Sequence, residues 1–387
     1  MELDRLYRCS WYHRWVESRA SLIRDPVRRL CYLRRAMPVL PRRRSGVHAM
    51  LLMAAAFGLV MIAIPGQNAG SGWLLDREVA APYRETRVAP EAAVWIVESR
   101  GTYEVYSNGL RIETDGVVEN EPRVSNVLQA GRLSVIAGQS APAGIVFHTT
   151  ESHIAPFEVT NNLRLQRVGR WLRDFVAQNR SYHYLIDRFG RVHRVVRESD
   201  AAYHAGVSVW GIQQTVWVNL NHSFLGVAFE SQTTAGDKLA ESVTPAQIRA
   251  AATLTSMLRS RYNLPADNCV THAQVSVNPA NMGIGLHTDW GANFPFAEVG
   301  LPDNYGQPLA AIHQFGFIAD ESYLNATGPR LARGIESAEQ TLSSQATALN
   351  LATDVHRQAL QQRYRKIMSA LPKQLAAATQ ESKENRQ

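Results

Sequence analysis

Short apolar runs alternate with amphipathic stretches through the middle of this chain, and this alternation limits what the chain can fold into. One amphipathic stretch begins at Thr244-Pro245, an N-cap followed by proline at the first helical position. The runs predicted as strands are 144–147, 182–186, 192–196, 225–229 and 269–272, and the predicted helices are 162–178 and 247–260. Elements mixed in this way predict an α/β domain with a mixed central sheet flanked by helices.

The segments on either side of this region differ from it in composition. Extended runs lie before it, and Asn108-Gly109 between two of them predicts a hairpin. The tail is rich in Ala, Gln, Ser and Arg with a loose apolar stripe, which predicts a long helix or helical hairpin. A partner-binding coiled coil is the alternative for this tail, but no heptad is sustained. We divide the chain into a basic N-terminal region (1–47), an apolar segment (48–65), a linker (66–90), a β-rich lead-in (91–140), the α/β domain (141–315) and a C-terminal helical extension (316–387).

The positive charge of the chain is concentrated in its first region. The whole chain has a net charge of +7, and residues 1–47 hold twelve arginines against four acidic residues, a net charge of +8. The remaining 340 residues therefore sum to −1. Because the basic balance belongs to a flank and not to the folded part, we expect no nucleic-acid partner.

The apolar segment after this basic region predicts contact with a membrane. Residues 49–64 contain no charged residue, and they follow a cluster of arginines. This order is typical of an export signal or an uncleaved signal anchor. The cleavage pattern around 67–70 is poor, which favours a retained anchor, whereas a buried core helix is the alternative. Only Cys269 follows this segment, so no disulfide framework is expected.

Three residues with metal-binding side chains lie in local contexts that suit a metal site. His148 closes one apolar run, His272 follows another, and Asp289 lies in a stretch rich in Gly, Trp and Pro. Two imidazoles and one carboxylate leave a fourth position open on zinc, which is the arrangement of a hydrolytic site. A single histidine is more often a core or surface residue, so the hypothesis depends on all three residues meeting in space.

Glu230 is the candidate for acid–base chemistry. Strand alternation puts it on one face with Gly226 and Ala228, two small residues that leave room for a group to approach the carboxylate. Such a carboxylate can accept a proton from water and deliver it to a leaving nitrogen, although a solvated strand end is the alternative. Cys269 and His272 are three residues apart and point to opposite faces, so we predict Cys269 as a core residue.

Seven motifs along the chain together carry a family resemblance. In order they are GIVFHTTES, SYHYLIDRFGRVHRVV, AAYHAG, LGVAFES, TPAQIRA, VTHAQVS and HTDWGANFPF. The chain thereby resembles the zinc-dependent N-acetylmuramoyl-L-alanine amidases (type 2 amidases) related to peptidoglycan recognition proteins. The resemblance covers roughly residues 141–305. It implies hydrolysis of the amide bond between N-acetylmuramic acid and L-alanine in peptidoglycan or its fragments, and it makes 141–315 the amidase domain.

Residue by residue, the resemblance assigns roles in a zinc site. It implies that zinc is held by His148, His272 and Asp289, and that Glu230 assists the attacking water. His287 stands where the family commonly has lysine, and the resemblance implies that it stabilises the developing charge on the carbonyl oxygen.

Two further positions match family residues near the substrate. Tyr182 matches a tyrosine used in the animal and phage branch, and His204 falls where the family lines the substrate groove. A loop histidine that caps local backbone is the alternative for His204.

The chain also departs from the family pattern. Trp290 replaces the usual proline after the third ligand, and the distance from His272 to that ligand implies a small insertion at 275–286. A non-catalytic muropeptide-binding module is the alternative function. With the apolar segment, the resemblance predicts peptidoglycan or muropeptides as partners and a location on the periplasmic side of the bacterial cell envelope, exported or anchored in the inner membrane.

Overall fold

The structure is a computed structural model, and a large part of the chain after residue 91 is described in it. The basic region, the apolar segment and the linker predicted above lie outside the described residues. In the part of the chain that the structure describes, no helix is both long and apolar enough to cross a membrane. The described residues are 92–129, 135–136, 140–152, 154–233 and 243–384.

A mixed sheet of eight strands forms the centre of the fold, as the alternating pattern predicts. The strand order is β1-β2-β3-β8-β7-β11-β6-β12, and the segment β7-β11-β6-β12 is parallel throughout. The antiparallel pairs β1–β2, β2–β3 and β7–β8 make the sheet mixed. The strands are β1 (Ile96–Arg100), β2 (Tyr103–Tyr106), β3 (Arg111–Glu113), β6 (Gly144–Thr149), β7 (Tyr184–Ile186), β8 (Val192–Arg194), β11 (Phe224–Phe229) and β12 (Cys269–Thr271).

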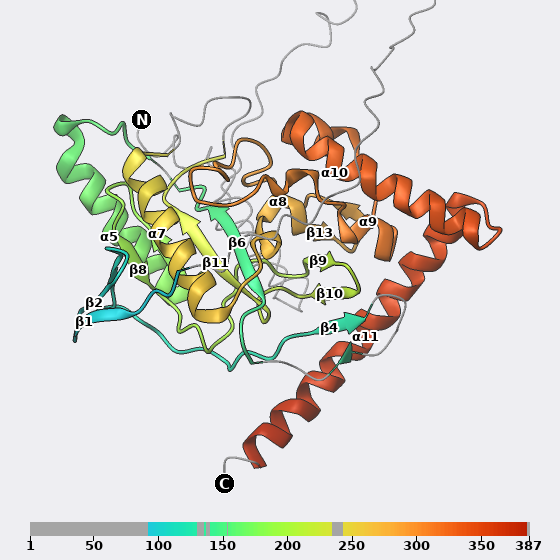
Figure 1. Ribbon diagram of the computed structural model, residues 1–387, viewed down its shortest axis with the longest axis horizontal. Coiled ribbons are helices and arrows are strands. Elements are labelled where there is room, and N and C mark those ends of the chain that lie inside the picture. The colour runs from blue at the N-terminus through green and yellow to red at the C-terminus, as the bar shows by residue number, and fades with distance from the viewer. Residues whose placement is uncertain (1–91, 130–134, 137–139, 153, 234–242, 385–387) are drawn as a thin grey trace, which may run out of the picture. The chain divides into compact units, whose positions relative to one another are not determined.

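Two helices cover opposite faces of this sheet (Figure 1). On one face, Leu172 and Val176 of α5 (Asn162–Asn179) join Ala228 of β11 in an apolar cluster. On the other face, α7 (Pro245–Tyr262) contributes Leu254 and other side chains to the cluster that holds Val227. Consecutive residues of a strand point to opposite faces, so β11 contacts both helices.

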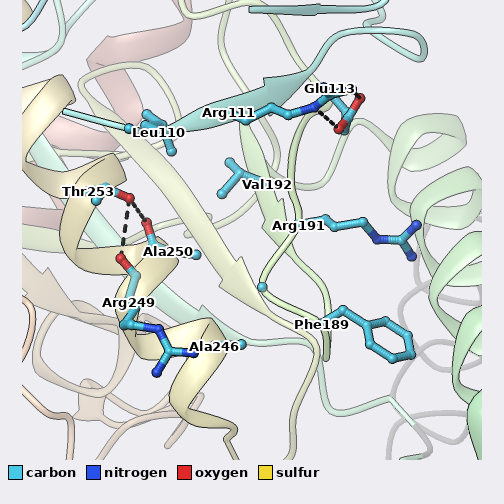
Figure 2. A pocket seen from close by; sticks show the side chains of 12 residues that line it. Leu110, Arg111, Glu113, Phe189, Arg191, Val192, Ala246, Arg249, Ala250 and Thr253 are labelled. Carbon is cyan, nitrogen blue, oxygen red and sulfur yellow. Dashed lines mark hydrogen bonds and ion pairs between the residues drawn. The ribbon is translucent and has the colours of Figure 1, made fainter. Parts of the chain in front are cut away.

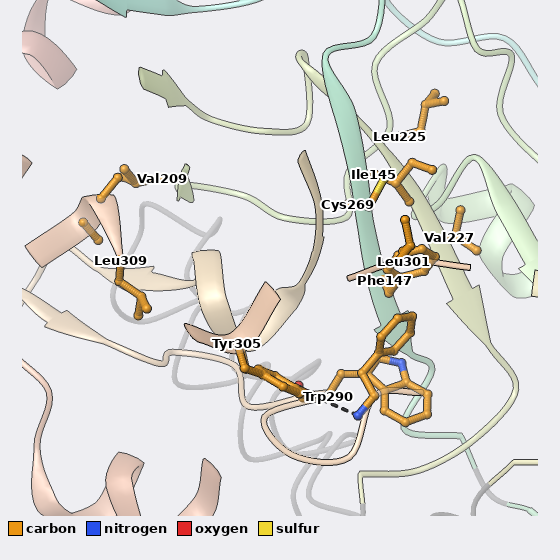
Figure 3. Packing of buried hydrophobic residues seen from close by; sticks show 14 of the residues in the cluster. Ile145, Phe147, Val209, Leu225, Val227, Cys269, Trp290, Leu301, Tyr305 and Leu309 are labelled. Atoms are coloured by element: carbon orange, nitrogen blue, oxygen red, sulfur yellow. Dashed lines mark hydrogen bonds between the residues drawn. The ribbon is translucent and has the colours of Figure 1, made fainter. Parts of the chain in front are cut away.

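The main core lies on the α7 side and extends to the loops that follow the domain's last strands. Figure 3 shows Ile145 and Phe147 of β6 near Cys269 and Leu301, with Trp290 and Tyr305 below them. Cys269 is fully buried in this cluster, which confirms it as a core residue. Burying each large side chain contributes about 1.5–3 kcal/mol.

Several elements were not predicted from the sequence. A second sheet has the order β5-β4-β10-β9, and the region after α8 (His272–Val275) forms a short hairpin, β13–β14, where an insertion was expected. Both edges of the second sheet are short strands, which a pattern of apolar runs does not distinguish from loops. The strands are β4 (Val127–Gln129), β5 (Val135–Ile136), β9 (Val209–Ile212), β10 (Thr215–Val218), β13 (Val277–Asn278) and β14 (Gly283–Ile284).

The C-terminal extension is helical, as predicted. α10 (Glu321–Ala348) and α11 (Thr353–Glu384) contact each other and the short helix α9 (Ala310–Phe315). Non-helical backbone at Gly328, followed by Pro329, divides α10 into two helical parts. Most of the apolar stripe predicted from the sequence is buried, namely Ile335, Ala338, Leu342 and Ala346, whereas Leu349 at the end of the stripe is exposed.

Candidate active site

Sheet topology brings the two candidate histidine ligands together. His148 lies near the carboxyl end of β6, and His272 is the first residue of α8 (His272–Val275), directly after β12. The two strands are parallel neighbours in which Thr271 pairs with Phe147. Thr271 forms the capping box that turns the chain from strand into helix. Both imidazoles therefore lie at one carboxyl edge, where α/β sheets commonly bind ligands.

Backbone contacts and packing around the loop after β14 hold the third candidate ligand. The carbonyl oxygen of Asp289 accepts a hydrogen bond from the backbone N–H of Ala273, at 3.1 Å. The next residue, Trp290, has a φ of +56°, a conformation that costs a bulky residue about 1 kcal/mol. Its ring packs edge-on against Phe229 and Phe294, with centroids 5.4 and 5.3 Å apart, and Tyr305 Oη donates to its carbonyl at 2.7 Å.

The three candidate ligands form one buried group. Asp289 Oδ2 lies 3.2 Å from His148 Nδ1, and Asp289 Oδ1 lies 2.8 Å from His272 Nδ1. One donor atom from each residue lies within 4.8 Å of the others. His272 Nε2 is buried and has no hydrogen-bond partner. Buried polar atoms are rarely left unpaired, so this donor set fits a bound cation.

Electrostatics favour the protonation states that a metal requires. Burial, with a contribution from His272, lowers the pKa of His148 to about 4, so this ring is neutral near pH 7. Burial by itself would raise the pKa of Asp289, but the His272 and His148 rings hold it well below its ordinary value. A neutral imidazole and an ionised carboxylate are the forms that bind zinc.

Glu230 follows β11 at the same edge of the sheet. Its neighbour Ala228 pairs with His148 across the parallel strands, so Glu230, two residues further, faces the same side of the sheet as His148. Its Oε2 accepts a hydrogen bond from the backbone N–H of Arg188 at 3.1 Å, and its Oε1 is buried without a partner. Burial raises the pKa of Glu230 to about 7, which suits a general base near neutral pH.

The room that Gly226 and Ala228 were predicted to leave beside Glu230 is occupied by other parts of the protein. A Cβ added at Gly226 would lie 2.6 Å from the ring of His204, and a Cβ added at Gly169 of α5 would lie 3.2 Å from Glu230 Oε2. The small residues of β11 therefore make room for a histidine and a helix, and not for an incoming group beneath the strand.

Two of the remaining predicted residues border the group. The ring of Tyr182 lies 5.1 Å from that of His148, and burial raises the pKa of Tyr182 far enough that its hydroxyl stays a donor. His287 stacks on His272 at 4.7 Å between centroids, and its backbone N–H donates to Ser276 Oγ at 2.9 Å.

His204 has a different position from the groove residue that the sequence predicted. Only 7% of the residue is exposed, and its ring nitrogens lie 3.1 Å from His148 Nε2 and 3.2 Å from the carbonyl oxygen of Phe224. Both nitrogens are therefore engaged behind His148, because the Gly226 backbone leaves space for the ring there.

Sequence reasoning missed Arg123, which lies in the lead-in before the domain. Its buried guanidinium donates to the carbonyl oxygens of Glu198, His222, Phe224 and Asp200 at 3.0–3.1 Å. Burial lowers its pKa to about 10. No local motif surrounds this arginine, and a single arginine in an extended segment gives no signal of such burial.

A pocket elsewhere on the domain holds none of these residues. Figure 2 shows this pocket of about 380 Å³ between β3, β8 and α7, lined among others by Arg111, Arg191 and Arg249. Arg111 pairs with Glu113 at 2.8 Å. The pocket is thus distinct from the His148 group, and the candidate chemistry lies at the carboxyl edge of the sheet.

The fold and the site together define a class of protein. A mixed α/β sheet with a buried His–His–Asp group at its carboxyl edge, and a buried carboxylate on the adjacent strand, has the arrangement of a hydrolase. Residues 138–291 match the protein family described as N-acetylmuramoyl-L-alanine amidase. The matched residues span the region in which most of the motifs lie, and the resemblance drawn from the motifs is confirmed.

One similar protein is an amidase of Escherichia coli. The chain is 32% identical over 106 residues to the N-acetylmuramoyl-L-alanine amidase AmiD of Escherichia coli (strain K12). That stretch is 25% of this chain and 37% of AmiD, so the chain spans little more than a third of the length of this relative.

Two solved structures are also similar. A complex of AmiD from E. coli with the substrate anhydro-N-acetylmuramic acid-L-Ala-D-gamma-Glu-L-Lys has 22% identity and a TM-score of 0.34, covering 54% of this chain and 84% of that one. AmpDh3 from Pseudomonas aeruginosa in complex with anhydromuramic pentapeptide has 19% identity and a TM-score of 0.30, covering 53% and 85%.

Proposed function

We propose that this chain is a zinc-dependent amidase that hydrolyses the bond between N-acetylmuramic acid and L-alanine in peptidoglycan or its fragments. The observation that supports this most is the convergence of His148, His272 and Asp289 on one buried group within a domain of the amidase family. The unpartnered His272 Nε2 and the ionised Asp289 fit a divalent cation. These three residues would hold zinc, and zinc there supplies Lewis-acid polarisation of the amide carbonyl.

The chain's own residues account for the proton transfers. Glu230, in its ionised form, takes a proton from the water that attacks the lactyl carbonyl carbon. The carbon–nitrogen bond then breaks, and Glu230 returns the proton to the departing nitrogen of L-alanine. The unpartnered Oε1 of Glu230 is the atom available for this exchange.

Two further residues act on the substrate in this proposal. His287, stacked on His272, donates a hydrogen bond to the oxygen that gains negative charge as the carbonyl is attacked. Tyr182, which keeps its hydroxyl proton, donates to the substrate beside His148. Each hydrogen bond to a developing charge is typically worth a few kcal/mol.

A non-catalytic muropeptide-binding module is the alternative from another class. Loss of a metal ligand is the simplest route to such a module. Here each of the three ligand positions holds a competent side chain, which supports the enzyme. The proposed location is the periplasmic side of the cell envelope, supported by the uncharged segment at 49–64 after a basic region.

Incubation of the full-length protein with purified cell-wall sacculi tests the proposal. We expect mass spectrometry to detect free stem peptides that begin with L-alanine, and we expect a chelator to abolish their release. Binding to sacculi without release of peptides, with or without added zinc, would instead establish the binding module.

A variant of Glu230 tests the mechanism separately from the metal. Glu230→Gln removes the proton acceptor with little change in size, so turnover should fall by roughly 10²–10⁴-fold while zinc content stays unchanged. Glu298→Gln is the matched control, because it makes the same change at an exposed side chain. Unchanged turnover of Glu230→Gln would remove this residue from the mechanism.

A further inference from the structure

We propose that His204 is a positioning residue that fixes the tautomer and orientation of His148, so that His148 presents an unprotonated Nδ1 to the metal. The inference rests on the proposed zinc site and assigns to it a residue that does not itself bind the metal. The geometry is a chain of contacts that runs from Asp289 through both histidine rings to a backbone carbonyl.

The contacts form an unbroken line. His148 Nδ1 lies 3.2 Å from Asp289 Oδ2, and His148 Nε2 lies 3.1 Å from His204 Nδ1. His204 Nε2 lies 3.2 Å from the carbonyl oxygen of Phe224. The two rings meet edge-on, at 80° with centroids 5.2 Å apart, and both are buried.

Hydrogen-bond chemistry assigns the protons along this line. A carbonyl oxygen only accepts, so His204 Nε2 must carry the hydrogen that faces Phe224. His204 Nδ1 is then an acceptor, and when His148 gives the lone pair of its Nδ1 to a cation, its Nε2 carries the hydrogen and donates to His204 Nδ1. His148 Nδ1 is left unprotonated, with its lone pair directed toward Asp289.

The contacts from Asp289 to Phe224 need one more hydrogen than the two histidine rings carry. Two neutral imidazoles carry two N–H groups, whereas the line from Asp289 to Phe224 has three contacts. In this assignment the contact without a hydrogen joins His148 Nδ1 to the carboxylate of Asp289, so two acceptors would face each other there if no cation were bound. A cation held by His148 and Asp289 would offset the repulsion between these two acceptors.

The opposite assignment of protons is unfavourable in this environment. If His148 Nδ1 carried the hydrogen, then either His148 Nε2 and His204 Nδ1 would face each other as two acceptors at 3.1 Å, or His204 Nδ1 would donate and its Nε2 would face the Phe224 carbonyl as a second acceptor. A doubly protonated His204 would be a cation buried without a carboxylate partner, which is costly. The Arg123 guanidinium also donates to the Phe224 carbonyl oxygen, at 3.1 Å, so its positive charge opposes a second positive charge on the His204 ring.

The position of His204 is fixed by its backbone and by a glycine. Asn221 Oδ1 accepts hydrogen bonds from the backbone N–H groups of His204, Ala205 and Gly206 at 2.9, 2.8 and 3.0 Å. The ring lies against Gly226, where a Cβ would approach it to 2.6 Å. The strand and the loop are thus shaped to hold this imidazole behind His148.

Zinc affinity of the full-length protein, measured by competition with a chromogenic chelator and without substrate, tests the inference. His204→Leu removes the acceptor, and we expect the zinc affinity to fall roughly 10–100-fold, as with other residues that support a ligand histidine. His204→Asn places an acceptor oxygen near the position of Nδ1, and we expect its affinity to stay within a few-fold of the unaltered protein. His222→Leu is the control, a buried histidine whose ring is not in contact with the group.

The outcomes separate the inference from the proposed function. Wild-type affinity in a folded His204→Leu protein, or equal losses in the Leu and Asn variants, would overturn the positioning role. If His204→Leu does not fold, Gly226→Ala displaces the ring and should lower zinc affinity similarly, and unchanged affinity there would overturn the role too. Absence of zinc binding by the unaltered protein would overturn the proposed function, and this inference with it.

Discussion

Asp289 Oδ1 lies 2.8 Å from Nδ1 of His272, although the two residues are 17 positions apart, one in the loop after β14 and the other at the start of α8. The second oxygen of Asp289 reaches His148 on β6 at 3.2 Å. One carboxylate therefore joins the two imidazoles that the parallel strands bring to the sheet edge. The whole proposed chemistry depends on this carboxylate, and the predictions below begin with it.

Asp289→Asn should abolish tight zinc binding. The amide has nearly the size of the carboxylate but no charge, so it neither offsets the charge of a divalent cation nor replaces an anionic ligand. We expect zinc affinity to fall more than about 100-fold and sacculus hydrolysis to be lost with it. Metal content after dialysis checks this, with Asp174→Asn, a change at an exposed side chain, as the control. Stoichiometric zinc in the Asn variant would contradict the ligand assignment.

The activity should depend on pH through Glu230. Its pKa of about 7 means that the carboxyl group is protonated, and unable to accept a proton, on the acid side of neutrality. We expect kcat/KM to rise through about pH 7 and to fall about tenfold for each pH unit below it. Initial rates on a soluble muropeptide across this range test the prediction. If Glu230→Gln keeps a measurable rate, and its kcat/KM falls at low pH as in the unaltered protein, then a group other than Glu230 causes the pH dependence.

The same residue should make stability depend on pH in the metal-free protein. The folded-state pKa of about 7 lies above the ordinary value of 4.5, so the folded protein keeps a proton that the unfolded chain has lost. The free energy of unfolding therefore falls as pH rises from about 4.5 to about 7, by about 3 kcal/mol, and levels off above that range. Denaturant unfolding of chelator-treated protein measures this, and Glu230→Gln should lack this part of the slope. If the free energy of unfolding depends on pH in the same way in Glu230→Gln and in the unaltered protein, the prediction is wrong.

Trp290→Ala should affect both stability and metal binding. The indole packs on Phe229 and Phe294, so its removal leaves a cavity that costs about 3–5 kcal/mol, partly offset by relief of its positive φ. Because Trp290 follows Asp289 directly, we also expect weaker zinc binding. Thermal unfolding and chelator competition test both effects, and Trp95→Ala is the control because 61% of Trp95 is exposed. Equal stability of the two variants would show that the ring has no supporting role.

The order of strands and helices was largely predictable from local patterns. Apolar runs gave the buried strands β6, β7, β8, β11 and β12, and the capping signal at Thr244-Pro245 gave the start of α7. These features are local, because period and capping depend on residues a few positions apart. The strands of the second sheet, which are two to four residues long, were not predicted from the sequence.

The identity of the site was also predictable, but its surroundings were not. Motif order pointed to His148, His272 and Asp289, and the structure brings these three residues together. The buried position of His204 was not predictable, because nothing in the sequence shows that Gly226 leaves space for its ring on the strand next to β6. Arg123 was also missed, because nothing near it in the sequence shows that its guanidinium is buried against the Phe224 carbonyl.

The sequence by itself determined the residue types, their order and the elements that carry them, because these depend on the chemistry of nearby positions. Only the tertiary structure decided that Asp289 reaches both imidazoles, that burial raises the pKa of Glu230 to about 7, and that His204 supports His148 from behind. Distances, desolvation and hydrogen-bond direction arise from segments that are remote in the chain. They take defined values only when packing fixes those segments against one another.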